Sequence, residues 1–486
     1  MILGGKIEAS WRRGQEMAYN FIECNREQMY LMPVSLEDWL SEGHLAWFML
    51  DAVEAMDLSQ FYLKYRADGW GRAAYDPQMM VSLLLYAYCL GVRSSRQIER
   101  VCEVDVAFRV ITGNLKPDYS TICRFRWENE RELGRLFTGV LRLCAEAGLV
   151  KAGVVALDGT KIKANASLSA NRTQEHIEEE VRKMLAEARE RDEEEDRLFG
   201  KDSRGDEIPE ELKDRRSRLA RLKECQERLA REKEEKIRSQ VEMIEKRKAE
   251  EEAAGHKKRG RKPKEVAEVL QEEAKAKANV TEPDSRIMKT RAGYIQGYNA
   301  QAAVDRGQII LAADVTQEPN DVHQLHPMTE KTQQELKAAG IEEEIKSELA
   351  DAGYWSEGNV AESSPTDPEF IIATTKDWKQ RKAMREQGAP RGRIPEHLSP
   401  RDRMERKLLT KRGRSLYKLR SQMVEPVFGQ IKSRGCDTFM RRGLEAVRNE
   451  WRLICATHNL LKLFRSKVSK FVNKISPTVA IAPASP

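Results

Sequence analysis

Length and composition already exclude several classes of protein. The chain has 486 residues, of which 40% are hydrophobic and 33% charged, which allows two or three domains but leaves long stretches too polar for a core. The N-terminal sequence MILGGKIEASWRR lacks the apolar run of a signal peptide, and no run elsewhere is long enough to span a bilayer. We therefore expect a cytoplasmic protein without a membrane partner. Eight cysteines without metal-ligand spacing predict free, mostly buried thiols.

The charge is distributed unevenly along the chain. The net charge is only +6, yet residues 376–474 hold 27 Lys and Arg against 9 Asp and Glu, a balance of 27 − 9 = +18. A basic block on an otherwise acidic protein is typical of a surface that binds a polyanion. Trp378, Tyr417 and Trp451 interleave with this charge, which favours nucleic acid over a solvated helix pair without a ligand. Trp378 could stack on an unpaired base or simply pack.

The first 150 residues are expected to form a helical domain, because apolar residues recur three and four apart from about residue 39 onward. Within it, residues 94–130 divide into three short helices, which suits a helix-turn-helix. A plain helical bundle with surface arginines is an equally good interpretation. Under the first hypothesis the residues that face a DNA groove are Thr121, Arg124 and Arg126.

Residues 173–278 are rich in Glu, Lys, Arg and Ala, with aliphatic residues at helical steps. This composition predicts a long helical or coiled-coil insertion, an arm for self-association or for reaching DNA. The segment 257–264 (KKRGRKPK) resembles the core of an AT-hook. A merely basic loop explains the same residues equally well.

Around this insertion the sequence predicts a mixed α/β sheet with flanking helices. The expected elements are a buried strand at 152–158 with a turn at 159–160, a hairpin at 298–315, a helix at 323–339, a strand ending at Asp351, a strand at 369–375, a basic loop at 376–400, and helices at 401–432 and 444–464. His458 lies on the apolar stripe of the last helix, so we expect a core histidine.

Three acids stand at positions where a charge needs a partner. Asp158 and Asp351 each close an apolar strand, and neighbouring strands could bring both to one edge of the sheet. Such carboxylates would repel unless a divalent cation lay between them, and hard oxygen ligands without His or Cys favour Mg²⁺ or Mn²⁺ over zinc. Glu425 is a suitable third ligand from a late helix. Each acid also has an alternative interpretation: Asp158 as a turn residue, Asp351 as the start of the following helix, and Glu425 as the partner of Lys432 in an ion pair.

Five segments together closely resemble the DDE transposases of bacterial insertion sequences. They are DPQMMVSLLLYAYCLGVRSSRQIER, VVALDGTKIKANAS, QGYNAQAAVD, LADAGY and YKLRSQMVEPVFGQIK. The resemblance implies a ribonuclease H-like catalytic domain at 151–172 and 279–476, followed by a flexible tail at 477–486. It also implies a catalytic, metal-binding triad of Asp158, Asp351 and Glu425. Its companions, which hold DNA phosphates, are Tyr417, Arg420 and Lys432.

The same resemblance implies Mg²⁺-dependent cleavage and strand transfer at the ends of an insertion sequence by a two-metal mechanism, with Mn²⁺ as a substitute. Asp158 would bridge both metals. The expected partner is double-stranded DNA in the nucleoid, bound by a homodimer that pairs two ends. A ribonuclease H-like nuclease or resolvase without strand transfer, and a catalytically inactive DNA-binding derivative, are the alternative functions.

This chain departs in one respect from the Tyr-Arg-Glu-Lys signature of the family. Four residues separate Arg420 from Glu425 here, where the family has three. On an ideal helix the extra residue would turn Arg420 about 140° away from Glu425. Pro426 favours a kink or π-bulge at residues 422–426 that would restore the alignment. A straight helix would leave only Glu425 and Lys432 aligned.

Overall fold

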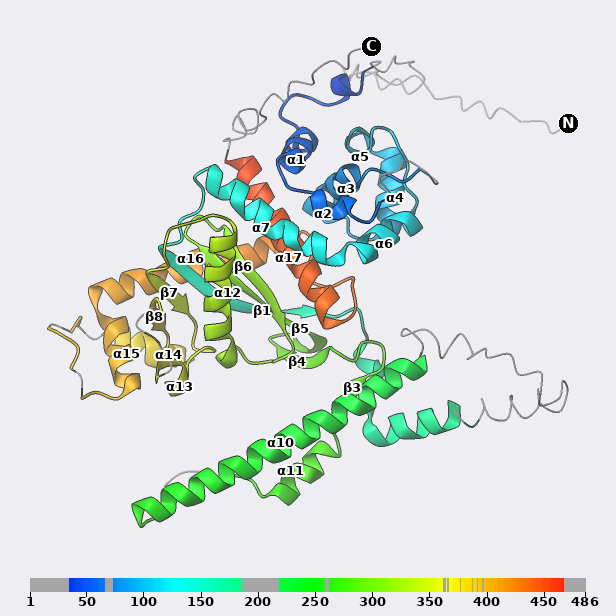
Figure 1. Ribbon diagram of the computed structural model, residues 1–486. Coiled ribbons are helices and arrows are strands. Elements are labelled where there is room, and N and C mark those ends of the chain that lie inside the picture. The colour runs from blue at the N-terminus through cyan, green and yellow to red at the C-terminus, as the bar shows by residue number, and fades with distance from the viewer. Residues whose placement is uncertain are drawn as a thin grey trace, which may run out of the picture.

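A computed structural model describes residues 35–65, 73–184, 186, 218–257, 262–361 and 397–466, together with most positions from 364 to 395. Figure 1 shows a group of helices at one end, a sheet covered by helices in the middle, and a long helical arm at the other end. Among the described residues, none of the helices combines the length and the apolar character that a membrane span requires.

The helical part builds a compact core around one nearly enveloped helix. Its elements are η1 (Leu36–Trp39), α1 (Leu45–Glu54), α2 (Ser59–Tyr62), α3 (Pro77–Cys89), α4 (Ser95–Val104), α5 (Val106–Ile111), α6 (Tyr119–Glu128) and α7 (Glu130–Glu146). Asp76 caps α3 and Pro77 occupies its first turn, where a missing N–H costs nothing. Nearly every later residue of α3 is buried, so α3 is the centre of this part.

The sheet is mixed, as predicted. Its strands are β1 (Val154–Lys163), β4 (Arg286–Thr290), β5 (Gly293–Asp305), β6 (Ile310–Thr316), β7 (Ser347–Ala350) and β8 (Glu369–Ile372). β5 pairs antiparallel with β1, β4 and β6, while β1–β7 and β7–β8 are parallel pairs. The predicted hairpin at 298–315 is confirmed as β5–β6. β1 therefore lies at the centre, with an antiparallel neighbour on one side and a parallel one on the other.

The turn predicted at residues 159–160 is wrong. β1 continues through Asp158 to Lys163, because β5 is long enough to pair with it over the whole stretch, up to Lys163↔Gly297. β7 is shorter and pairs with β1 only from Val154 to Ala156. Asp158 thus lies inside a strand, at the point where one of its two neighbouring strands has ended.

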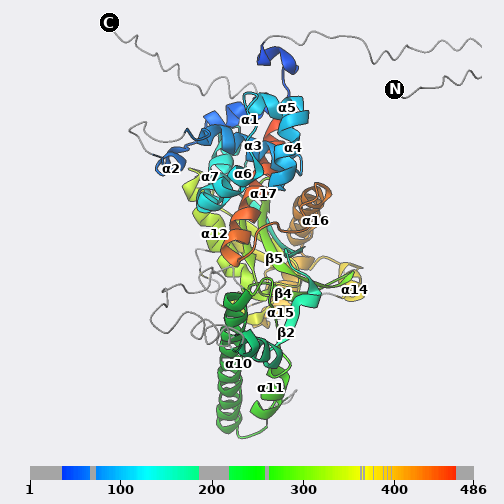
Figure 2. The ribbon, with the colours of Figure 1, turned by 90° about the vertical axis from the view of Figure 1, so that its right-hand side faces the viewer.

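Helices cover both faces of the sheet (Figure 2). The helices of this part are η4 (Val322–Gln324), α12 (Leu325–Ala338), α13 (Glu357–Ala361), α14 (Trp378–Glu386), α15 (Pro400–Leu409), α16 (Lys411–Ser433) and α17 (Leu444–Arg465). Two expectations need correction. The predicted loop at 376–400 contains α14, and the predicted helix at 401–432 is two helices, because Thr410 is extended and its side chain caps α16 at Gly413.

α17 joins the helical part to the sheet. It packs against α7 on one side and β6 on the other. The Trp451 indole donates to the Gln301 carbonyl at 2.9 Å, and the Asn459 amide bonds both backbone groups of Ile310. His458 is a core histidine, as predicted: it is buried against the Gln308 carbonyl, and burial lowers its pKa to about 3. The seven described cysteines are free, and all except Cys123 are buried.

The arm begins and ends at one two-stranded ribbon. Its elements are β2 (Asn171–Thr173), a helical segment at 174–184, α10 (Arg218–Ala254), α11 (Val266–Glu273) and β3 (Lys277–Asn279). Pairing of Asn171 with Asn279 closes the insertion at its base. A second, small hydrophobic cluster lies here, built from Ile177, Leu222, Cys225, Leu229 and Ala278. The AT-hook-like segment falls partly outside the described residues.

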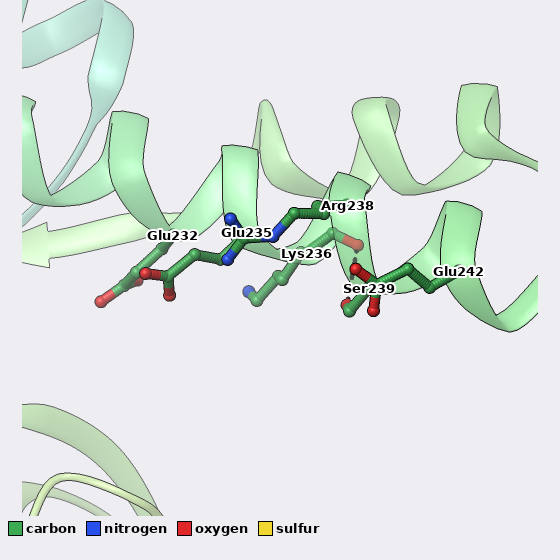
Figure 3. Close-up of a pocket in the computed structure, with 6 residues that line it drawn as sticks. All are labelled: Glu232, Glu235, Lys236, Arg238, Ser239 and Glu242. Carbon is green, nitrogen blue, oxygen red and sulfur yellow. Dashed lines mark hydrogen bonds between the residues drawn. The ribbon is translucent and has the colours of Figure 1, made fainter.

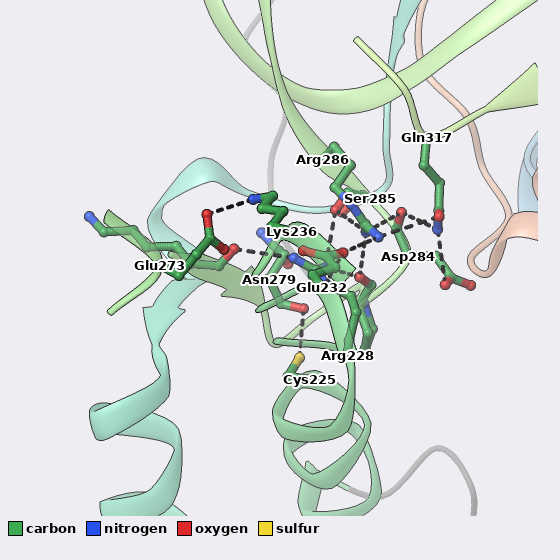
Figure 4. Close-up of polar contacts among 12 residues, drawn as sticks. Cys225, Arg228, Glu232, Lys236, Glu273, Asn279, Asp284, Ser285, Arg286 and Gln317 are labelled. Carbon is green, nitrogen blue, oxygen red and sulfur yellow. Dashed lines mark hydrogen bonds and ion pairs between the residues drawn. The ribbon is translucent and has the colours of Figure 1, made fainter. Parts of the chain in front are cut away.

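Charged contacts fix the base of the arm to the sheet (Figure 4). The buried guanidinium of Arg228 donates to the carbonyls of Pro283 and Lys277. Glu232 accepts from Arg286 of β4 at 2.7 Å, and Arg286 also reaches Gln317 just after β6. Further out, one face of α10 forms an open depression of mixed charge that no second described element encloses (Figure 3). It lies on the arm and is no candidate for the chemistry.

Candidate active site

The strand register brings Asp158 and Asp351 together. Val154 pairs with Ser347 and Ala156 with Leu349, so the same offset places Asp351 beside Asp158. β7 ends at Ala350, and the Gly353 N–H donates to Asp351 Oδ1 at 2.6 Å. The Gly159 N–H donates to Asp158 Oδ1 at 2.9 Å. Each aspartate therefore has one oxygen held by the backbone and a second one, Oδ2, that can face a cation.

Arg420 of α16 occupies the point where three carboxylates converge. Its Nη2 lies 3.3 Å from Asp158 Oδ2 and 3.8 Å from Asp351 Oδ2, while Nη1 lies 3.1 Å from Glu425 Oε1. The exposed fractions of the three acidic side chains are 17%, 38% and 58%, against 11% for Arg420. The site is thus open on the side of Glu425 and closed behind Asp158.

Burial dominates the electrostatics of this cluster. It raises the pKa of Asp158 to about 7, against the opposing effect of Arg420 and with a further upward contribution from Asp351. Burial also opposes the charge of Arg420, but Asp158, Asp351 and Glu425 outweigh it and raise the pKa of Arg420. Asp158 therefore sits where a carboxylate needs positive charge nearby.

Sequence analysis predicted a kink or a π-bulge near Pro426, and the π-bulge is absent from α16, every residue of which is described and α-helical. The alignment is achieved differently: the Arg side chain is long enough to reach Glu425 from five residues away. Pro426 has no N–H for the carbonyl of Gln422, and this carbonyl accepts from the side chain of Gln308 at 2.9 Å instead. The reach of the Arg420 side chain therefore accommodates the extra residue, and Gln308 supplies the hydrogen bond that Pro426 cannot make.

The two remaining residues of the signature lie along the same helix. Lys432 Nζ donates to Thr160 Oγ1 at 2.6 Å, two residues beyond Asp158 on β1. Burial lowers the pKa of Lys432. Tyr417 is half-buried against the core, and it lies near enough to Arg420 to contribute to the raised pKa of that residue. α16 therefore faces the Asp158 edge of β1 along several of its turns.

The donor set is compatible with a divalent cation. Three carboxylates and no sulfur or imidazole surround one positive group, which is the chemistry that Mg²⁺ or Mn²⁺ selects. In the described part of the chain, however, no three His, Cys, Asp or Glu side chains lie close enough together to hold an ion as they stand. The guanidinium of Arg420 separates them, so a bound metal would have to displace it.

Three predicted DNA-facing residues lie outside this cluster. Trp378 begins α14, and Arg124 is exposed on α6. Arg126 does not face a groove: it is 7% exposed, donates to the Arg93 carbonyl at 2.9 Å and to the Tyr88 hydroxyl at 2.6 Å, and thereby ties α6 to α3. This burial is at odds with the expectation for Arg126, which we withdraw as a DNA contact.

Sequence reasoning missed a polar group on the opposite face of β1. Asp321 Oδ1 accepts from Asn299 at 2.7 Å and from Gln301 at 2.8 Å, and lies 3.6 Å from Lys161 Nζ. Asn299 and Gln301 are buried on β5 among alanines and valines. Buried amides in a largely apolar strand, which also holds Gln296, were the available signal, because buried polar side chains need partners.

Two protein families match the chain. Residues 34–128 match the family described as "Transposase domain", and residues 254–460 match the one described as "Transposase DDE domain". The second match includes Asp351, Arg420 and Glu425, while Asp158 lies ahead of it, before the arm. Together the two matches indicate a DDE-type transposase of the insertion-sequence kind. Neither a search of curated proteins nor one of solved structures found a match.

Proposed function

We propose that the protein cuts and rejoins DNA at the ends of its insertion sequence, with Asp158, Asp351 and Glu425 as the metal-binding acids of a ribonuclease H-like domain. The observation that carries the proposal is their convergence on Arg420 from three different elements, β1, the end of β7, and α16. A structural ion pair requires one acid. Three acids around one base leave excess negative charge, which suits a site where divalent cations take the place of the guanidinium.

The acids have unequal environments and hence unequal roles. Asp158, held by the Gly159 N–H, is the most buried and the best placed to bridge two ions. Asp351 and Glu425 flank it and would each hold one. Mg²⁺, when bound, supplies Lewis-acid activation of the attacking hydroxyl and charge stabilisation for the leaving oxygen. Glu425, the most exposed of the three, is carried by α16 and lies on the open side of the site.

The cations beside the triad are suited to hold DNA. Lys432 stands over Thr160, and exposed Arg403, Lys411 and Lys418 continue the positive surface along α15 and α16. Each lysine or arginine that neutralises a phosphate releases counterions and so contributes to binding. Arg124, Tyr417 and Trp378 remain proposed contacts. Because two ends must be paired before joining, we also propose a homodimer on DNA.

A strand-transfer assay tests this function. Duplexes taken from the DNA that borders the gene are incubated with the protein, Mg²⁺ and a supercoiled plasmid. We expect cleavage at the border and covalent joining of the new 3′ ends to the plasmid. Cutting without joining would favour the nuclease alternative. Binding without cutting, in Mn²⁺ as well as Mg²⁺, would favour an inactive DNA-binding derivative.

A further inference from the structure

A second polar cluster lies against the triad on the other face of β1. Asp158 and Thr160 point toward α16, whereas the intervening Gly159 and the following Lys161 lie on the face of Asp321. Gly159 and Lys161 pair with Gln301 and Asn299 of β5, so the four positions share this face. Lys161 is also close enough to Asp158 and Asp351 to feel their charge.

Gly159 shows how tightly this cluster is assembled. A Cβ at Gly159 would lie 2.3 Å from the Gln301 amide nitrogen, 2.6 Å from Asp321 Oδ1 and 2.8 Å from Asn299 Oδ1. No side chain fits there. Gln301 is held in turn by the hydroxyl of Tyr354, which is fully buried. Asp321 therefore has a fixed position over the backbone of β1, one residue from Asp158.

Asp321 does not need Lys161 as a hydrogen-bond partner. Its Oδ1 already accepts from two amides, at 2.7 and 2.8 Å, whereas Lys161 Nζ is 3.6 Å away. Partly buried ion pairs contribute little net stability, because desolvation offsets the attraction. Stability alone therefore gives no reason for a lysine at this position, whose side chain is only 18% exposed.

The charge geometry gives such a reason. Lys432 contacts β1 from the face of α16, and Lys161 is held on the opposite face by Asp321. A DNA phosphate that reaches the Asp158–Asp351 edge would meet a cation from each side of the strand. A lysine held by a fixed carboxylate is oriented for this contact before DNA arrives.

We propose that Lys161 is a phosphate-contacting residue of the DNA-cutting site and that Asp321 is its positioning residue. The inference rests on the proposed function. Asp321 makes no contact with DNA itself: it acts by holding the ammonium group of Lys161 beside the triad.

The test compares Lys161→Met, Lys161→Arg, Asp321→Asn and the double variant Lys161→Met/Asp321→Asn. Methionine keeps the length of the chain without its charge, and asparagine keeps an acceptor for the two amides while removing the attraction for lysine. Lys163→Met is the matched control, since Lys163 is exposed two residues further along the same strand. Single-turnover cleavage of the border duplex is measured at saturating protein, together with the salt dependence of duplex binding.

We expect Lys161→Met to slow cleavage by about 10- to 100-fold, as loss of one electrostatic contact in a transition state does, while Lys161→Arg retains most of the rate. Asp321→Asn should slow cleavage in the same direction, and the double variant should be no slower than Lys161→Met. Lys163→Met should cut normally. The logarithm of the DNA-binding constant should fall less steeply with the logarithm of salt concentration in Lys161→Met. The magnitude of this slope should decrease by about 0.9, as expected for the loss of one phosphate contact.

Two results would overturn the inference. A Lys161→Met protein that cuts as fast as Lys163→Met would remove Lys161 from the site. A double variant much slower than Lys161→Met would show that Asp321 acts independently of the lysine. If the wild-type protein binds the duplex but cuts nothing, the proposed function fails, and the salt slope alone still decides whether Lys161 contacts a phosphate.

Discussion

Arg420 is the residue on which the metal-free site depends. Its guanidinium is within 4 Å of all three acids, so it neutralises the charges that a divalent cation would neutralise. Metal binding and the ion pairs of Arg420 therefore compete. A displaced guanidinium would be free to bind a phosphate, which would couple metal loading to DNA binding.

Without metal, Arg420→Met should accordingly have a free energy of unfolding about 1–3 kcal/mol below that of the wild type, because Asp158 loses its cation. Its melting temperature should fall as a result. The rise in melting temperature on adding Mg²⁺ should be larger than in the wild type, and DNA cleavage should fall. Thermal denaturation with and without Mg²⁺ measures both changes in melting temperature, with exposed Arg135→Met as control. A smaller Mg²⁺ effect in Arg420→Met would mean that the guanidinium organises the metal ligands instead.

Glu348 makes a second residue-level prediction. It is fully buried on β7, and burial raises its pKa to about 8 from an ordinary 4.5. The Thr329 hydroxyl lies 2.9 Å from the Leu325 carbonyl and 2.8 Å from Glu348 Oε2. One hydroxyl proton cannot serve both oxygens, so both contacts form together when Glu348 is protonated and donates to Thr329.

Because the folded-state pKa is raised, the proton stabilises the fold fully below pH 4.5, and this stability is lost as the pH rises to about 8. Glu348→Gln keeps a donor at all pH values. Its unfolding free energy should therefore fall less than that of the wild type between these limits. Urea denaturation at several pH values measures the difference. Parallel pH profiles for the two proteins would rule out a buried neutral acid.

α16 carries the prediction at the level of elements. The helix continues through Pro426, and the carbonyl of Gln422 is bonded by Gln308 rather than by an N–H of the helix. Pro426→Ala restores that N–H and removes a clash, so we expect about 1 kcal/mol of added stability with the Mg²⁺ response intact. Chemical denaturation checks this. A destabilised variant would show that proline shapes the helix in a way that Arg420 depends on.

The order of elements was largely predictable from sequence, and their limits were less so. Apolar runs predicted β7 and β8, and helical spacing predicted α12 and α17. The length of β1 was not predictable, because its last residues pair with the distant strand β5 and, at Lys163, with Thr438. The helix start at Lys411 depends on the extended backbone of Thr410, a residue with no strong preference for breaking helices.

The candidate acids were proposed from the sequence, and their geometry was only partly predictable. Asp158, Asp351 and Glu425 follow from family resemblance, and the register of β1 and β7 places the two aspartates side by side. The contact of Arg420 with all three was not predictable, because helical periodicity describes where a side chain begins and not how far it reaches. Asp321 was missed because it belongs to no strand and precedes a short 3₁₀ turn.

At the scale of the whole molecule, the arm packs around a hydrophobic cluster separate from the main core, whereas the N-terminal helices do not. The arm has its own small hydrophobic cluster, whereas α1–α7 share one core with the sheet through α17. Joining Thr173 to Lys277 through a two-residue turn should therefore leave the rest folded, since these residues are already paired.

We expect that shortened protein to unfold in one transition, within about 5 °C of the full chain, and to keep its response to Mg²⁺. Calorimetry measures both. The small decrease in unfolding temperature would come from losing the contacts of Arg228 and Glu232 with Pro283 and β4. A shortened protein that fails to fold would show that the arm is part of the catalytic core.

The most direct test of the account is Asp158→Asn, assayed for cleavage and for binding of the border duplex, with exposed Glu357→Gln as a control. The asparagine keeps the size of the side chain but removes the charge from the most buried acid of the site. We predict binding close to that of the wild type and no cleavage in either Mg²⁺ or Mn²⁺, while Glu357→Gln cuts normally. Normal cutting by Asp158→Asn in Mg²⁺ would contradict the proposed triad.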